Sequence, residues 1–286
     1  MAGKRSRLRL AVNSIAWILS FVIAATSVPA AVAQEATMMT PPKVLAIVRE
    51  DIKPGKNAAH VKIESGFARD FAHTDLHYFG ATTVTGTNAA FFFEGFATFA
   101  EWQAVQESEG KDPAIAADLD RLNEQDSDLM TGSRTIVAAY REDLSYQPVV
   151  PVKGTRYFEM IVERIRPGYE EAFEAMRKRV AAAHVKAGVE EHFAVYQVML
   201  GAPAGTYIVF TPLRSLGDLD QLEGAHGKAY QDAVGEEGRK ESRELARQSL
   251  MEEEVNLLSI NPRMSNPPKA WRDADPDFWS PKPDAK

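Results

Sequence analysis

The chain has 286 residues, of which 33 are basic and 40 acidic, a formal net charge of −7 and no cysteine. The lack of cysteine excludes disulfide bonds, thiolate metal sites and cysteine nucleophiles. The acidic balance argues against a nucleic-acid partner, which needs clustered lysine and arginine.

Residues 1–33 have the composition of an export signal. Four basic residues precede a mostly apolar run, 11–25, and Ala31-Val-Ala33 forms a small-x-small cleavage site. The alternative is an uncleaved membrane anchor, but the apolar run is shorter than the roughly 20 residues that a span needs. Cleavage would remove four basic and no acidic residues and leave a formal charge of −11. We therefore predict a periplasmic or secreted protein with no membrane span after cleavage.

One pattern occurs twice in the remaining chain. The segments 44–55 and 157–168 each read as a β-strand that ends in Pro-Gly and leads into an amphipathic helix. Aligning Pro54 with Pro167 gives an offset of 113 residues. The repeat indicates a duplicated domain, in which Gly55 and Gly168 are expected to share a backbone conformation that suits glycine.

The first half predicts six elements in the order β-α-β-β-α-β. They are strand 44–52, helix 56–73, strands 78–84 and 90–96, a helical region from 98 through 122, and strand 133–140. Thr98 with Glu101 has the pattern of a capping box at the start of the second helical region. In the first helix, Ala59, Ile63 and Phe67 share a face that should pack on the sheet.

The second half predicts the same order. Its elements are strand 157–165, helix 169–186, strands 192–200 and 206–211, a helix to about 253, and strand 255–260. This order is the ferredoxin-like arrangement. The predicted organisation is a lead-in at 34–43, domains at 44–145 and 156–260, a proline-containing linker at 146–155 and a tail at 261–286. The tail aromatics Trp271, Phe278 and Trp279 should pack on the body or close a groove, although they could instead anchor a partner.

The order of elements resembles that of the dimeric α+β barrel superfamily, which includes antibiotic-biosynthesis-monooxygenase-like and stress-responsive barrel domains. The shared order is a strand that ends in Pro-Gly, a helix, a hairpin and a second helix that begins with Ser or Thr. The resemblance covers 44–140 and 157–260. It implies an α+β fold in which tandem ferredoxin-like repeats form an intramolecular barrel, because each sheet alone would expose one face. Alternation from Tyr157 would place Glu159, Ile161 and Glu163 on the helix-free face, so a partly wet interior is expected.

Candidate catalytic residues come from these strands. Glu50 and Glu163 are equivalent and could approach each other across a pseudo-twofold axis, where like charge would raise one pKa and suit acid–base work. The alternative is that both point to solvent. A second candidate polar group in the interior consists of Glu159, His192 and Tyr196.

Metal and cofactor sites have weaker signals. His184 and His192 flank Glu190-Glu191, but the spacing matches no ligand motif and a solvated loop is favoured, so the sequence indicates no metal site. Some members of the superfamily bind haem through a histidine after the third strand, and the resemblance makes His226 the candidate. The tryptophan and asparagine that accompany it in haem-degrading relatives have no match here.

The sequence contains neither a glycine-rich phosphate loop nor a Gly-x-Ser-x-Gly elbow. We predict an exported protein that binds a small, partly apolar molecule in the barrel or a groove. The alternatives are a monooxygenase-like enzyme, with or without haem, and a barrel that serves as an interaction module. The fold by itself does not choose among them.

Overall fold

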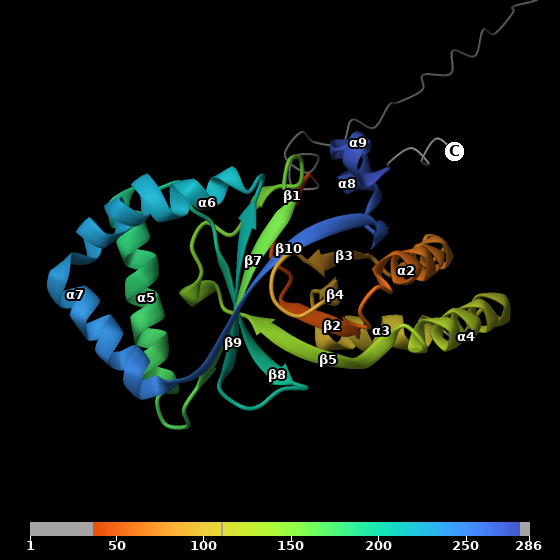
Figure 1. Cartoon of the computed structure of the whole chain (residues 1–286), viewed down its shortest axis with the longest axis horizontal. Helices are drawn as coiled ribbons and strands as arrows, with labels where there is room; N and C mark the ends of the chain where they lie inside the picture. Colours follow the sequence, from red (N-terminus) through yellow and green to blue (C-terminus); the bar gives the residue numbers. More distant parts are fainter. Residues whose placement is uncertain (1–36, 110, 281–286) are drawn as a thin grey trace, which may run out of the picture.

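Eight antiparallel strands close into a barrel in the computed structural model, which describes residues 37–109 and 111–280 (Figure 1). The strand order is β10-β3-β4-β2-β5-β8-β9-β7. The predicted export signal lies outside the described residues. Within those residues, no helix is long and apolar enough to cross a bilayer.

The elements of the first half are β1 (Met38–Met39), β2 (Val44–Ile52), α2 (Asn57–Phe71), β3 (Tyr78–Thr83), β4 (Ala89–Phe96), α3 (Phe99–Glu109), α4 (Pro113–Ser127), β5 (Met130–Tyr140) and a 3₁₀ turn at Glu142–Leu144. Those of the second half are β6 (Val150–Pro151), β7 (Tyr157–Ile165), α5 (Glu170–Ala187), β8 (Ala194–Leu200), β9 (Thr206–Leu213), α6 (Gly217–Gln221), a π-helical turn at Leu222–His226, α7 (Gly227–Ser249), β10 (Leu250–Asn266), α8 (Lys269–Ala274) and α9 (Pro276–Trp279).

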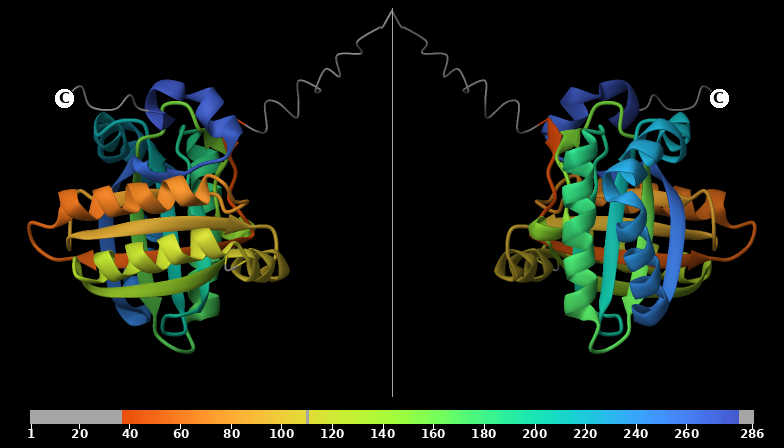
Figure 2. Two further views of the ribbon diagram at one scale, coloured as in Figure 1. Left: turned by 90° about the vertical axis from the view of Figure 1, so that its right-hand side faces the viewer. Right: turned by 90° about the vertical axis from the view of Figure 1, so that its left-hand side faces the viewer.

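The two halves share one barrel. β3, β4, β2 and β5 are neighbours in the first half, and β8, β9, β7 and β10 are neighbours in the second. Two ladders join the halves, because β5 pairs with β8 and β10 pairs with β3. Figure 2 shows α2 and α4 on one side of the barrel and α5 and α7 on the opposite side.

Alternation along the strands divides the apolar residues among three clusters. Side chains from strands of both halves, such as Ile47 and Met160, fill the barrel. A second cluster lies between the first-half strands and α2, and a third lies between the second-half strands and α5. The barrel is therefore a packed interior between two helical layers, and neither half encloses it alone.

The Pro-Gly turns after β2 and β7 match each other. Gly55 has a φ of +76° and Gly168 a φ of +90°, which is the left-handed region that glycine adopts with least strain. At the start of α3 the amide of Glu101 donates to Thr98 Oγ1 at 3.1 Å, and Glu101 Oε2 accepts from the amide of Ala97 at 2.6 Å. The glycine turns and the Thr98 half of the capping box are confirmed, while the Glu101 carboxylate binds the amide one residue before the predicted one.

The end of the second half differs from its prediction. The helix expected to reach about residue 253 ends at Ser249, and the strand expected at 255–260 extends from Leu250 to Asn266. β10 must be long because it pairs with β7 from Leu250 to Ser259 and with β3 from Leu258 to Asn266, which closes the barrel. The run Glu252 to Glu254 reads as helical in the sequence, but in the barrel it is strand.

Part of the predicted lead-in at 34–43 forms a strand. Met38 and Met39 form β1, which pairs with Val150 and Pro151 of β6 in the interdomain segment. This short two-stranded sheet lies next to the end of the barrel that α8 and α9 cover (Figure 1).

Candidate functional site

A cavity of about 250 Å³ opens at the barrel end near β1 and α8. Its walls are mostly aromatic side chains and prolines, among them Phe79, Phe93, Phe158, Phe210, Tyr196 and Trp271. Small-molecule sites in proteins are typically concave, apolar and equipped with few polar groups. This cavity has that composition.

The aromatic rings hold one another in place. Phe79 stacks on Phe93 with centroids 4.8 Å apart and on Phe158 at 5.7 Å. Phe210 meets the edges of both Phe93 and Phe158, and its ring lies 5.9 Å from that of Tyr196. Because these rings come from strands of both halves, the cavity exists only when the barrel is closed.

The tail covers one side of the cavity. Trp271 of α8 lies 6.2 Å from Phe79, ring to ring. The tail is fixed to the barrel by Arg156, the residue before β7, which donates to Asp275 Oδ2 at 2.7 Å and places its guanidinium 3.9 Å from the centre of the Phe278 ring. The tail aromatics thus pack on the body, which was the favoured alternative from the sequence.

Few polar groups reach this cavity. The hydroxyl of Tyr196 donates to the carbonyl of Pro42 at 3.2 Å, and burial raises the pKa of this phenol well above its usual value. His77 contributes to the rim and is exposed. Tyr196 is therefore a neutral hydrogen-bonding group and not a base.

No protein-family model matches the sequence, and no curated protein matches it. Several solved structures do match. A candidate monooxygenase from Fusobacterium nucleatum is 9% identical, covers 78% of this chain and 94% of its own, and has a TM-score of 0.50. A candidate monooxygenase from Lactobacillus acidophilus is 11% identical over 76% of this chain and 93% of its own, with a TM-score of 0.47. A mutant chlorite dismutase from Candidatus Nitrospira defluvii is 12% identical over 82% and 96%, with a TM-score of 0.47.

The chain has an α+β barrel fold. At 9% identity, the likeness to the Fusobacterium protein concerns the fold alone. The site must therefore be argued from the residues of this chain.

The structure does not bring Glu50 and Glu163 together. Both side chains point away from the barrel interior toward their own helices: Glu50 Oε2 lies 2.9 Å from His60 Nε2 of α2, and Glu163 pairs with Arg177 of α5. The expected facing of β7 is wrong, because Phe158, Met160 and Val162 line the interior while Ile161 and Ile165 pack toward α5. The interior is consequently more apolar than predicted at this strand.

The predicted group of Glu159, His192 and Tyr196 is also wrong as an interior cluster. Tyr196 alone lies in the barrel core. Glu159 faces the helical side, where burial and the charges of Glu223 and Glu191 raise its pKa. His192 lies outside the barrel and its Nδ1 is 2.7 Å from the carbonyl oxygen of Gln147.

His184 forms part of a separate polar contact. Its Nε2 lies 2.6 Å from Glu191 Oε2, and its Nδ1 lies 2.8 Å from the carbonyl oxygen of Val180. His192 does not join this contact, and Glu190 is exposed. The solvated loop favoured from the sequence is therefore wrong for His184, which is buried and hydrogen-bonded, and the imidazoles of His184 and His192 make separate contacts.

The residues present do not fit haem. His226 lies outside the barrel in a groove that also contains His192, Glu190, Glu191, Asp218 and Arg214. Its Nδ1 is 3.9 Å from Glu191 Oε1. An axial histidine presents a neutral nitrogen to iron in a pocket that excludes water, whereas this groove carries several charges. On the wall of the apolar cavity the one histidine is His77, and it is exposed.

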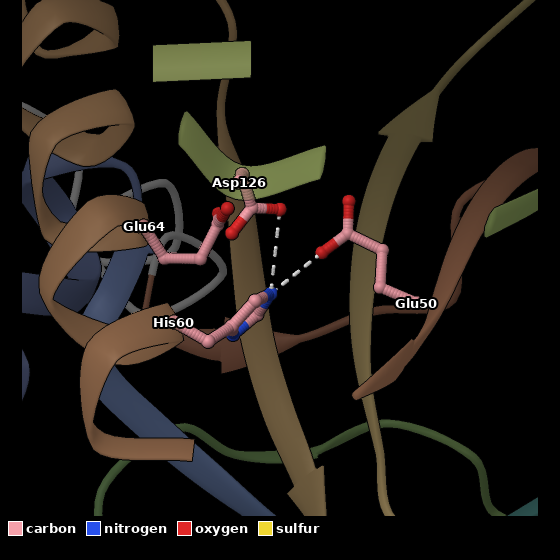
Figure 3. A group of neighbouring side chains, drawn as sticks. All are labelled: Glu50, His60, Glu64 and Asp126. Carbon is pink, nitrogen blue, oxygen red and sulfur yellow. Dashed lines mark hydrogen bonds and ion pairs between the residues drawn. The ribbon is translucent and has the colours of Figure 1, made fainter. Parts of the chain in front are cut away.

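A buried cluster in the first half was not singled out by the sequence. Glu50, His60, Glu64 and Asp126 come together between β2, α2 and α4 (Figure 3). The predicted sheet-facing side of α2 is wrong, since Ala59 is exposed and the buried positions include His60 and Glu64. The available signal was a histidine and a glutamate four residues apart, which share one face of a helix.

Proposed function

We propose that the protein binds a small, ring-containing apolar molecule in the barrel cavity beneath Trp271. The observation that carries this proposal is the set of aromatic side chains around a cavity of about 250 Å³. Offset and edge-on contacts with these rings favour a flat apolar ligand. The hydroxyl of Tyr196 and the rim residue His77 could each form one orienting hydrogen bond.

Two further inferences belong to this proposal. We infer that the halves are tandem ferredoxin-like repeats that arose by duplication, which is supported by the repeated β-α-β-β-α-β order and the matched Gly55 and Gly168 turns. We also infer that residues 1–33 direct export, so that the ligand is met outside the cytoplasm. The basic and apolar pattern of that segment supports this inference.

Binding can be tested with N-phenyl-1-naphthylamine, an uncharged probe that fluoresces in apolar sites. We expect saturable binding of one probe per chain. Trp271→Leu should weaken it at least fivefold, about 1 kcal/mol, because one wall is lost. Trp102→Leu is the matched control, since that partly buried tryptophan packs on the outer cluster of the first half. Absence of saturable binding, or equal weakening by both substitutions, would refute the proposal.

A monooxygenase-like reaction in the same cavity is the second candidate. A structural neighbour at a TM-score of 0.50 is a candidate monooxygenase, which is the reason to retain it. The cavity supplies little for such chemistry, because Tyr196 is neutral and His77 lies at the rim. Oxygen uptake with 1-naphthol that exceeds the rate in buffer and is lost in His77→Ala would favour the enzyme. Uptake at the buffer rate would favour binding alone.

A further inference from the structure

Four potential metal ligands converge in the first half, outside the barrel cavity. Glu50 comes from β2, His60 and Glu64 from α2, and Asp126 from the last turn of α4. One ligand atom from each lies within 4.8 Å of every other. Figure 3 shows the four side chains pointing toward a common centre.

Three of the four side chains are almost fully removed from water. His60 is 1% exposed, Asp126 2% and Glu64 5%. His60 Nε2 lies 2.9 Å from Glu50 Oε2 and 3.7 Å from Asp126 Oδ2. One imidazole nitrogen can give one proton, so it cannot satisfy both carboxylates and Glu64 as well.

One oxygen in the cluster has no partner. Asp126 Oδ1 is buried and accepts no hydrogen bond. Among the described residues, Glu50 and Asp126 each form an ion pair with His60, and no ion pair joins either of them or Glu64 to a lysine or arginine. Buried carboxylates normally pair with a cation or bind a metal. The unsatisfied oxygen therefore indicates that a positively charged partner belongs at this centre.

The second half shows that the fold does not require such a cluster. With the offset of the repeat, the positions of Glu50, His60 and Glu64 correspond to Glu163, Phe173 and Arg177. The ladders pair Ile52 with Met130 and Ile165 with Leu250, so Asp126 corresponds to Ala246.

In the second half the charge of the corresponding glutamate is balanced by an arginine and not by a metal. Arg177 neutralises Glu163, and Phe173, 2% exposed, fills the space that the imidazole occupies in the first half. The same scaffold position thus accepts an ion pair and an aromatic ring. The four ligands of the first half are a feature of that half and not a consequence of the barrel.

We propose that Glu50, His60, Glu64 and Asp126 bind one divalent transition-metal ion that ties α2 and α4 to β2. One nitrogen and three oxygens without thiolate suit zinc, manganese or iron(II). Tetrahedral ligands at the usual zinc distances are about 3.4 Å apart, and the His60 distances of 2.9 and 3.7 Å lie on either side of that value. Magnesium is disfavoured because it prefers oxygen ligands and retains several waters.

The site is structural rather than catalytic. Four protein ligands complete a tetrahedral shell, and structural zinc sites are closed in this way whereas catalytic sites keep a position for water. His60, Glu64 and Asp126 are buried, and of the four ligands Glu50 alone, with a side chain 14% exposed, reaches solvent. The metal would act by holding two helices against the first-half sheet, and its loss would loosen that layer without changing the barrel cavity directly.

The test is metal content of the full chain after stripping with chelator and dialysis against Zn²⁺ or Mn²⁺. We expect one equivalent of metal per chain by elemental mass spectrometry, and a higher midpoint of thermal unfolding with metal than without. Co²⁺ should give the intense visible absorption of a tetrahedral site. Glu64→Gln and Asp126→Asn preserve shape and should each weaken binding at least tenfold and remove the thermal shift.

Glu163→Gln is the matched control, because it changes the equivalent glutamate in the second half and should keep one equivalent of metal. If the wild-type chain retains no metal, or if the two ligand substitutions leave affinity and the Co²⁺ spectrum unchanged, the site is a protonated hydrogen-bond network and the proposal is wrong. The spectrum and stoichiometry do not depend on the barrel ligand, so this result is independent of the function proposed above.

Discussion

Glu50 and Glu163 occupy the same position in the two halves of the barrel, yet each is paired with a different partner on the helix that follows its strand. Glu50 Oε2 lies 2.9 Å from His60 Nε2, while Glu163 forms an ion pair with Arg177. Both halves therefore carry a glutamate on the outer face of their first long strand, and its partner on the following helix differs. This difference separates a cluster of ligands from a simple buried ion pair.

The first prediction concerns that ion pair. The side chains of Arg177 and Glu163 are 13% and 7% exposed. Removing one partner of a buried pair leaves an uncompensated charge, which costs about 3–5 kcal/mol. We expect Arg177→Met to lower the free energy of unfolding in urea by roughly that amount. Arg177→Met combined with Glu163→Leu should recover most of the loss, since the unpaired charge is gone. If the losses of stability from Arg177→Met and from Glu163→Leu simply add in the double variant, this account is wrong.

The second prediction concerns the dependence of each half on the other. The ladders β5–β8 and β10–β3 and the interior cluster are all made by both halves. Residues 34–147 expressed alone would expose two strand edges and an apolar sheet face. We expect this fragment to aggregate, dimerise or remain poorly folded, as measured by light scattering and NMR. A stable, well-dispersed monomer would show that the half folds without its partner.

The third prediction concerns the Pro-Gly turns. Gly55 and Gly168 have positive φ, and a Cβ at either would meet no neighbouring atom within 4 Å. Valine there should therefore cost about 1–3 kcal/mol through backbone strain alone. Gly132 of β5 is the control, because it also has open space but no positive φ. If thermal melts show that Gly55→Val and Gly168→Val lose no more stability than Gly132→Val, backbone strain at the two turns is not the cause.

Much of the fold could be predicted because it rests on local patterns. Pro-Gly breaks, strand alternation and the Thr98 capping box depend on neighbouring residues, and each is recognisable in a short window. Strand facing was harder, since β7 carries residues suited to either face. Phe158 turns inward and Glu163 outward because α5 supplies Arg177, a contact that the sequence pattern alone does not reveal.

The same limits apply to the candidate site residues, because their positions depend on strand facing and on contacts between distant segments. Tyr196 was placed in the interior on an assumed facing of its strand, and it lies in the barrel core. The cluster around His60 was missed because the stripe of Ala59, Ile63 and Phe67 has the appearance of a sheet-facing surface. Apolar spacing normally indicates the buried face. Here the buried face carries His60 and Glu64, whose neighbours Glu50 and Asp126 come from other elements and cannot be read from the pattern of α2.

The fourth prediction concerns acid stability. Arg141 donates to Glu174 Oε1 at 2.6 Å and, through Nε, to Asp143 Oδ1 at 3.0 Å. Hydrogen bonds from Arg141 lower the pKa of Asp143 to about 2 and also lower the pKa of Glu174. A carboxyl whose pKa is lower in the folded state stabilises the fold above its unfolded pKa, about 4, and this stabilisation is lost as pH falls through the folded pKa.

We therefore expect the stability difference between wild type and Arg141→Met to be largest above about pH 4.5 and to shrink toward pH 2. The effect should be modest, because Asp143 is 44% exposed and solvent screens the pair. Urea unfolding across this pH range measures the stability difference. Lys228→Met, which removes the exposed ion pair with Asp232 on α7, is the control. A difference that does not change with pH would contradict the assignment.

The last prediction concerns haem binding, which the resemblance to the superfamily suggests and which a titration tests directly. His226 Nδ1 lies 3.9 Å from Glu191 Oε1, and its side chain is 28% exposed in a charged groove outside the barrel. An axial ligand needs a neutral imidazole facing an apolar pocket that excludes water. We expect haemin titrated into the purified protein to produce no stoichiometric Soret shift, with the same result for His226→Ala. A tight one-to-one complex that this substitution abolishes would make His226 an iron ligand and would favour the enzyme over the binding protein.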